Sequence, residues 1–270
     1  MAIEQTLAAK PQPETQAQPV AVAFAPNALL LAGLLLLWGL AGTCLGDTLS
    51  VLWQWTPLLA QGLKMNILIS LLAIGGGTVL GVLIGALELS GSVWVAAPAR
   101  AFVALFRNAP LLVLIFFTTY VFPFEIHIGS VYLPFPDWIK ATVGLALPAA
   151  AQVAEIVRGA IGSIPSAQWE ASASLAFSRA QTLRWIILPQ CFRRVLPPWM
   201  NLYAMITMST TLASLVGVTD LLESAKNASN TVNRTDFTIL VYLAVLTLFF
   251  FYCYPIALLT RRLEHKFAIH

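Results

Sequence analysis

The feature that most constrains this chain is a succession of apolar runs, each long enough to cross a lipid bilayer. About 20 helical residues span the ~30 Å hydrocarbon layer. Only 10% of the 270 residues are charged, and a soluble domain has about 25%. The sequence therefore predicts an all-α integral membrane protein with six transmembrane helices. They are expected near residues 28–46, 63–88, 103–123, 138–160, 195–219 and 237–260.

Basic residues predict the orientation of these spans, because Lys and Arg accumulate on the cytoplasmic side. Six spans place both termini on the same side of the membrane. The basic residues then divide into an inner group and an outer group. With both termini cytoplasmic, the inner group is Lys10, Arg100, Arg107, Arg158, Arg179, Arg184, Arg193, Arg194, Arg261, Arg262 and Lys266. The outer group is then Lys64, Lys140, Lys226 and Arg234. This imbalance favours cytoplasmic termini and a cytoplasmic loop at 161–194.

The N-terminal residues 1–27 are rich in Gln, Pro and Ala, which predicts a disordered cytoplasmic tail before the 28–46 span. Metal binding is not predicted. The cysteines show no CxxC spacing and are interpreted as small buried apolar residues. The three histidines show no metal-ligand spacing. The cysteines are Cys44, Cys191 and Cys253, and the histidines are His127, His265 and His270.

The segment EASASLAFSRAQTLRWIILPQ, residues 170–190, is more polar than its surroundings. It predicts a helix with Ser166 as N-cap and Glu170 near its first turn, where a carboxylate suits the helix dipole. Leu188-Pro189 is expected to end the helix, because proline disfavours helix in the residue before it. One interpretation is an amphipathic helix lying on the inner leaflet. The other is a surface whose small side chains let a partner's backbone approach.

This segment resembles the EAA loop of binding-protein-dependent ABC importer permeases. That pattern is Glu-Ala-Ala, a Gly six residues after the Glu, and Ile-x-Leu-Pro after nine more residues. The chain has Ser in place of the second Ala and Ala in place of the Gly, and the loss of Gly is expected to straighten a turn. The resemblance implies ATPase-coupling residues at Glu170, Ala171, Ser172, Ala173, Ala176, Leu188 and Pro189.

Further blocks, in the same order along the chain, resemble the polar amino acid permease subfamily of these importers. They include GLKMNILIS, FRNAPLLVLIFF, AEIVRGAIGSIPSAQWEAS, LPPWMN and TTLASLVGVTDLL. The resemblance covers roughly residues 60–265, with the coupling loop at 161–190. It implies the type I ABC importer permease fold, with five core helices plus one extra N-terminal helix.

The resemblance also implies the partners and the localisation. Two cytoplasmic ATPase subunits, a second permease subunit and a substrate-binding protein are expected, in a bacterial inner membrane and without nucleic acid. ATP and Mg would be bound by the ATPase, since this chain has no GxxxxGK[ST] motif. The glycines of GGGTVLGVLIG, residues 75–85, are expected to allow close helix packing.

Polar residues at membrane depth give two further predictions. Glu155 and Arg158 are three residues apart and can pair on one helix face. We interpret them as a structural or gating ion pair. Hydroxyl side chains of the fifth span either line a pathway or bond back to the helix backbone. The candidates for pathway lining are Thr207, Ser209, Thr210, Thr211 and Ser214.

Three classes of function are compatible with a chain of this kind. The first is the permease subunit of an ATP-driven importer of polar amino acids, with no catalytic site of its own. The second is a secondary transporter or channel acting without an ATPase, which predicts charged residues deep in several spans. The third is a membrane-embedded enzyme, for which the sequence offers no catalytic motif such as HExxH.

Overall fold

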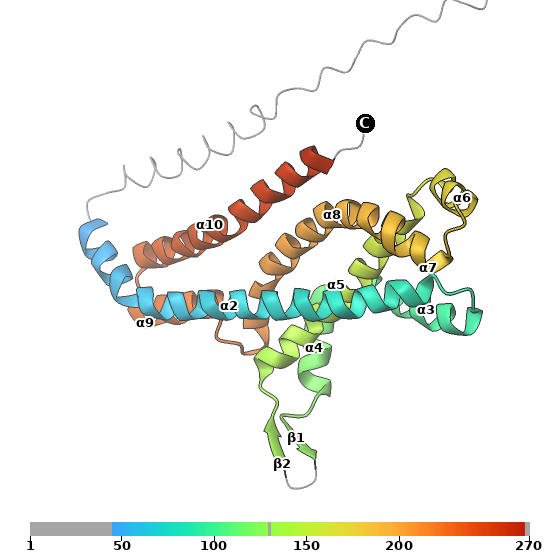
Figure 1. The fold of residues 1–270 in the computed structure, drawn as a ribbon. Helices are drawn as coiled ribbons and strands as arrows, with labels where there is room; N and C mark the ends of the chain where they lie inside the picture. The colour runs from blue at the N-terminus through green and yellow to red at the C-terminus, as the bar shows by residue number, and fades with distance from the viewer. Residues whose placement is uncertain (1–44, 129–130, 268–270) are drawn as a thin grey trace, which may run out of the picture. The chain divides into compact units, whose positions relative to one another are not determined.

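The computed structural model describes residues 45–128 and 131–267. The chain divides into two compact units, Met1–Leu49 and Ser50–His270, and the architecture below is that of the second. Figure 1 shows its helices and one small hairpin. The elements are α2 (Leu45–Glu88), α3 (Val93–Asn108), α4 (Leu111–Val121), β1 (Glu125–Ile128), β2 (Val131–Pro134), α5 (Asp137–Gly162), α6 (Ser166–Ser174), α7 (Arg179–Gln181), a π-helical segment (Thr182–Ile187), α8 (Leu188–Ser209), a 3-10 segment (Thr210–Val216), α9 (Leu221–Val232) and α10 (Thr235–Phe267).

Among the described residues, three single helices are long and apolar enough to cross a membrane. They occupy Gly46–Glu88, Asp137–Gly162 and Thr235–Glu264. Two bent helix pairs bring the total to five if each pair is one span. The expected 28–46 span lies almost wholly outside the described residues. A helical membrane protein is therefore confirmed, and the count of six spans stays a prediction.

The expected single helix over 103–123 is wrong, because the chain breaks there. α3 ends at Asn108 and α4 begins at Leu111, with an angle of 108° between them. Ala109 adopts an extended conformation (φ −75°, ψ 137°). It precedes Pro110, whose ring disfavours helix in the preceding residue. The sequence contains this proline, but a single span was predicted because the run is long and mostly apolar.

The prediction of an all-α chain missed a short hairpin. β1 and β2 pair antiparallel, with Glu125 opposite Pro134 and Ile128 opposite Val131. The adjoining end of α5 holds Lys140, a fully buried lysine. Its ammonium lies 3.1 Å from a carboxylate oxygen of Asp137 and 3.7 Å from the centre of the Phe124 ring. Both contacts compensate the charge for its loss of water.

The main core forms where α5 packs against α2, α4 and α8. Along α2, the glycines at 77, 81 and 85 face α5 closely. A Cβ would collide with α5 at Gly77 and Gly81, and it would be in tight contact at Gly85. A Cβ on Gly81 would lie 2.5 Å from the carbonyl oxygen of Ala150. The same atom on Gly76 would have nothing within 4 Å. Small residues at four-residue spacing thus allow the two helices to approach closely, as the sequence predicted.

A buried polar cluster connects α2 to the chain between the 3-10 segment and α9. The Asn66 amide nitrogen donates to Thr210 Oγ1 (2.9 Å) and to Asp220 Oδ2 (3.1 Å). Its amide oxygen accepts from the backbone N–H of Leu221 (2.9 Å). Asp220 also caps α9 by accepting from the backbone N–H of Glu223. In a low-dielectric interior such a fully used amide fixes the position of both segments.

Candidate functional site: the coupling loop

The coupling loop, residues 161–190, centres on α6, which joins the region of α5 to that of α8 (Figure 1). α6 begins at Ser166, and its N-cap is Pro165. The expectation that Ser166 itself is the N-cap was therefore wrong by one residue. Proline fits this place because its backbone angles are extended and its missing N–H is not needed there. Glu170 consequently lies in the middle of α6 rather than in its first turn.

α6 ends in a left-handed turn at Ala176. The backbone φ of this residue is 58°. The N–H of Ala176 donates to the carbonyl of Ala173 (2.9 Å), and the N–H of Phe177 donates to the carbonyl of Ser172 (3.1 Å). This pair of hydrogen bonds is the Schellman C-cap, which usually has glycine at the left-handed position. The turn is kept although the glycine is replaced, so the expectation of a straightened turn was wrong.

The chain from α7 to α8 continues as helix through Leu188-Pro189. Ser178 opens it with a capping box, in which Ser178 and Gln181 bond reciprocally. A π-helical segment over Thr182–Ile187 then leads directly into α8. The prediction that Leu188-Pro189 ends a helix was wrong. Proline is tolerated here because it stands in the first turn of α8, where its N–H is not required.

Two contacts hold the coupling loop to α5 and α8. Trp169 packs against a small apolar cluster that includes Ala160 of α5 and Cys191 of α8. Arg194 of α8 donates to the carbonyl oxygen and to the hydroxyl of Ser163, both at 2.7 Å. α6 is thus connected to α5 at its start and to α8 through the buried side of the loop.

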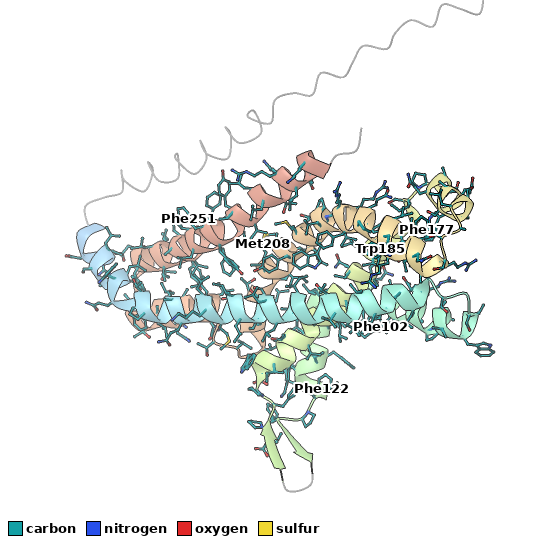
Figure 2. All side chains as sticks on the ribbon, in the orientation of Figure 1. Phe102, Phe122, Phe177, Trp185, Met208 and Phe251 are labelled. Atoms are coloured by element: carbon teal, nitrogen blue, oxygen red, sulfur yellow. The ribbon has the colours of Figure 1, made fainter. Side chains whose placement is uncertain are left out.

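The opposite side of α6 presents small residues and one carboxylate to the surroundings. We define the coupling surface as the exposed residues Glu170, Ala171, Ala173, Leu175, Ala176 and Phe177. Figure 2 shows Phe177 beside α6, and Leu175 is 71% exposed. The Glu170 side chain makes no ion pair with any residue that the structure describes. It is free to meet a cation or a backbone N–H of another protein.

The structure places three of the expected coupling residues outside the coupling surface. Ser172 is 1% exposed, and its hydroxyl donates to the carbonyl oxygen of Gln168 (2.6 Å). It therefore faces the chain's own interior, and its small size serves packing within the loop. Leu188 and Pro189 are exposed at the start of α8, beyond the π-helical segment.

The pair Glu155 and Arg158 belongs to a larger network of charges. Arg158 donates to both carboxylate oxygens of Glu155, at 2.7 and 3.3 Å. Arg107 of α3 reaches the same carboxylate at 3.3 Å, and Arg158 Nε lies 3.8 Å from Glu88 of α2. The ion pair within α5 is thus part of a bridge between three helices.

The hydroxyls proposed as pathway lining mostly donate to the backbone of their own helix. Ser209, Thr210, Thr211 and Ser214 donate to carbonyls three or four residues earlier. Thr207 is fully buried, and its hydroxyl has no hydrogen-bond partner among the described residues. Back-bonding is the usual state of hydroxyls in transmembrane helices, so lining of a pathway stays a prediction for all five.

Comparison with known proteins identifies the family of this chain. Residues 77–268 match the family model of the binding-protein-dependent transport system inner membrane component. The chain belongs to this family. The match includes α5, the coupling loop and α8, so the protein is an importer permease. Such permeases work with an ATPase and a substrate-binding protein.

Individual relatives agree with this family. The permease is 33% identical to the probable amino-acid ABC transporter permease protein YckA of Bacillus subtilis, over 78% of this chain and 90% of that protein. It is 31% identical to the glutamine transport system permease protein GlnP of Escherichia coli, over 82% and 97%. A crystal structure of an amino acid ABC transporter with histidines matches the fold with a TM-score of 0.66 and 24% identity, over 78% and 96%.

Sequence reasoning missed several polar residues of this permease. Asn66 and Asp220 are far apart in the chain, and only the fold brings them together. Glu88 and Arg107 belong to the charge network around Glu155. One sequence signal could have indicated this network. Arg100 and Arg107 of α3 are seven residues apart and therefore share a helix face.

Proposed function

We propose that this permease forms the transmembrane pathway of an ATP-driven importer of amino acids in a bacterial inner membrane. Family membership and relatives named as amino-acid and glutamine permeases support this substrate class. The chain itself is proposed to have no catalytic site. ATP and Mg are bound and used by separate ATPase subunits, and a substrate-binding protein delivers the amino acid from the other side of the membrane.

The coupling surface is the proposed docking site of the ATPase. The observation that carries this assignment is a surface of small residues, Ala171, Ala173 and Ala176, around the Glu170 carboxylate, which has no ion-pair partner among the described residues. Alanine side chains let a partner's backbone come close. Leu175 and Phe177 supply apolar anchors at the end of the same helix. A charged group surrounded by small residues suits a cleft better than a lipid surface.

The two attachments of the coupling loop suggest how ATPase closure reaches the membrane. Trp169 fixes α6 against α5 and α8, and Arg194 ties α8 to the turn that follows α5. The Schellman turn at Ala176 keeps the end of α6 from unwinding under load. Displacement of the coupling surface by the ATPase therefore moves the ends of α5 and α8 together, because packed elements shift as rigid bodies.

The proposed assembly contains two permease subunits, identical or related, above two ATPase subunits. One chain has too few core spans to enclose a polar route. The N-terminus, the coupling loop and the C-terminus are proposed to be cytoplasmic, which agrees with the distribution of Lys and Arg. The Glu155–Arg158 pair is proposed as a structural or gating contact at the end of α5 nearest α6.

Reconstitution in proteoliposomes tests the proposed function. We expect uptake of a labelled amino acid only when the permease, the ATPase, the binding protein and ATP are all present. Glu170→Arg should abolish this uptake without reducing membrane insertion, because Glu170 lies outside the candidate spans. Uptake by the permease alone, without ATPase or ATP, would instead establish a secondary transporter or channel.

A further inference from the structure

A cavity of about 540 Å³ lies where α2, α3 and α5 meet, near the end of α5 that leads into α6. Glu88 from the end of α2 lines it together with Leu89. α3 contributes Arg100 and Arg107 from one helix face, and α5 contributes the Glu155–Arg158 pair. The volume exceeds that of a free amino acid, so the cavity can admit one together with water.

The charges around this cavity are only partly used by one another. Arg107 and Arg158 both contact Glu155. Glu88 is 4% exposed, and its Oε2 atom accepts no hydrogen bond from the described residues, although Arg158 Nε lies 3.8 Å away. Arg100 forms no ion pair with any described residue. The cavity therefore offers two groups that the described residues use incompletely. The buried Glu88 carboxylate has an ion-pair neighbour in Arg158 but no hydrogen-bond donor at Oε2. The exposed Arg100 guanidinium has no ion-pair partner among the described residues.

We propose that this cavity binds the zwitterion of a free α-amino acid. Glu88 accepts hydrogen bonds from the α-ammonium group, and Arg100 binds the α-carboxylate through its planar fork of donors. A simple anion would leave the buried Glu88 oxygen without a partner, which is unfavourable. The side chain of the amino acid lies against the apolar atoms of Val103 and Ala104.

The side of the membrane that this cavity faces is inferred from the proposed function. The cavity shares the end of α5 that leads into the coupling loop, so the site faces the compartment that receives the imported amino acid. It is a product site, occupied when the internal amino acid concentration is high. A ligand there bridges α2 and α3, since Glu88 and Arg100 belong to different helices.

Equilibrium binding to the permease–ATPase complex tests the proposal. The complex is placed in phosphatidylcholine nanodiscs without ATP or binding protein, and the probe is a tritiated mixture of L-amino acids. We expect saturable binding that falls about tenfold or more in Arg100→Gln and in Glu88→Gln, because each removes a charged hydrogen-bond partner. The matched changes Lys64→Gln and Glu223→Gln lie outside the cavity and should leave binding unchanged.

Competitors and lipids identify the ligand. Amino acid methyl esters and the corresponding carboxylic acids each lack one of the two charges and should compete weakly. Three results would overturn the proposal: unchanged binding in Arg100→Gln, displacement of the label by inorganic phosphate as effective as by amino acids, or displacement by phosphatidylethanolamine in the nanodisc. ATP-driven uptake into empty vesicles is measured for the same variants. Uptake should stay normal in both variants, because the vesicles hold no internal amino acid. If the unaltered complex imports normally but shows no saturable binding, the product site is refuted and the proposed function is left intact.

Discussion

The left-handed turn at Ala176 gives a prediction whose sign depends on the structure. Alanine at a φ of 58° is strained because its Cβ approaches the following carbonyl, at a cost of about 1–2 kcal/mol. Ala176→Gly removes this strain and should stabilise the folded loop by about 1 kcal/mol, after the greater freedom of glycine in the unfolded loop is counted. The same substitution at Ala171, inside α6, should destabilise it by about 1 kcal/mol.

Hydrogen exchange measured by mass spectrometry can follow both variants, because α6 opens locally in native conditions. A change of 1 kcal/mol alters the open population about fivefold. Amides that are bonded within residues 166–177 should exchange about fivefold more slowly in Ala176→Gly and about fivefold faster in Ala171→Gly. Peptides from α10 serve as an internal control. Faster exchange in both variants would refute the left-handed turn and the Schellman cap built on it.

Three other predictions concern packing, orientation and the buried cluster. Gly81→Ala should lower thermal stability in detergent by about 1–3 kcal/mol relative to Gly76→Ala, because only the first Cβ collides with α5; equal melting of the two variants would contradict the close approach. In sealed cells with the native cysteines replaced, an impermeant thiol reagent should label Asn227→Cys and leave Leu175→Cys unlabelled, and the reverse result would invert the topology. Asn66→Ala should cost about 1–3 kcal/mol by leaving buried partners unsatisfied, and an unchanged melting temperature would argue against the cluster.

The long apolar runs predicted the helical membrane protein because length and composition are sufficient for that inference. They could not predict how the helices are broken. The run over 103–123 is mostly apolar, and Pro110 separates α3 from α4 just after its polar residues Arg107 and Asn108. The hairpin of β1 and β2 was missed because it lies between two predicted spans, where no periodic pattern extends far enough to be recognised.

The spacing of the residues in the Glu-Ala-Ala and Leu-Pro pattern predicted the position of the coupling loop. It did not predict the conformation of the loop. Ser172 belongs to the pattern, yet it is buried, because side chains on adjacent positions of a helix point in different directions. Ala176 keeps a turn that its residue type disfavours, since two hydrogen bonds and the attached helices over-determine the backbone there. Asn66 and Asp220 show the further limit, because contacts between distant segments cannot be read from local spacing.

Docking of an ATPase on the coupling surface can be measured by co-purification of the ATPase with the Ala173→Trp variant. Overpacking at a close contact commonly costs about 1–3 kcal/mol, so docking should fall about tenfold to hundredfold and ATP-driven uptake should be lost with it. Ala173→Ser and Ala97→Trp are the controls, the first small at the same site and the second equally bulky on the exposed side of α3. Both controls should retain the ATPase. Normal co-purification and uptake with Ala173→Trp would show that no ATPase docks closely there, because tryptophan is tolerated on a helix that merely rests at a lipid interface.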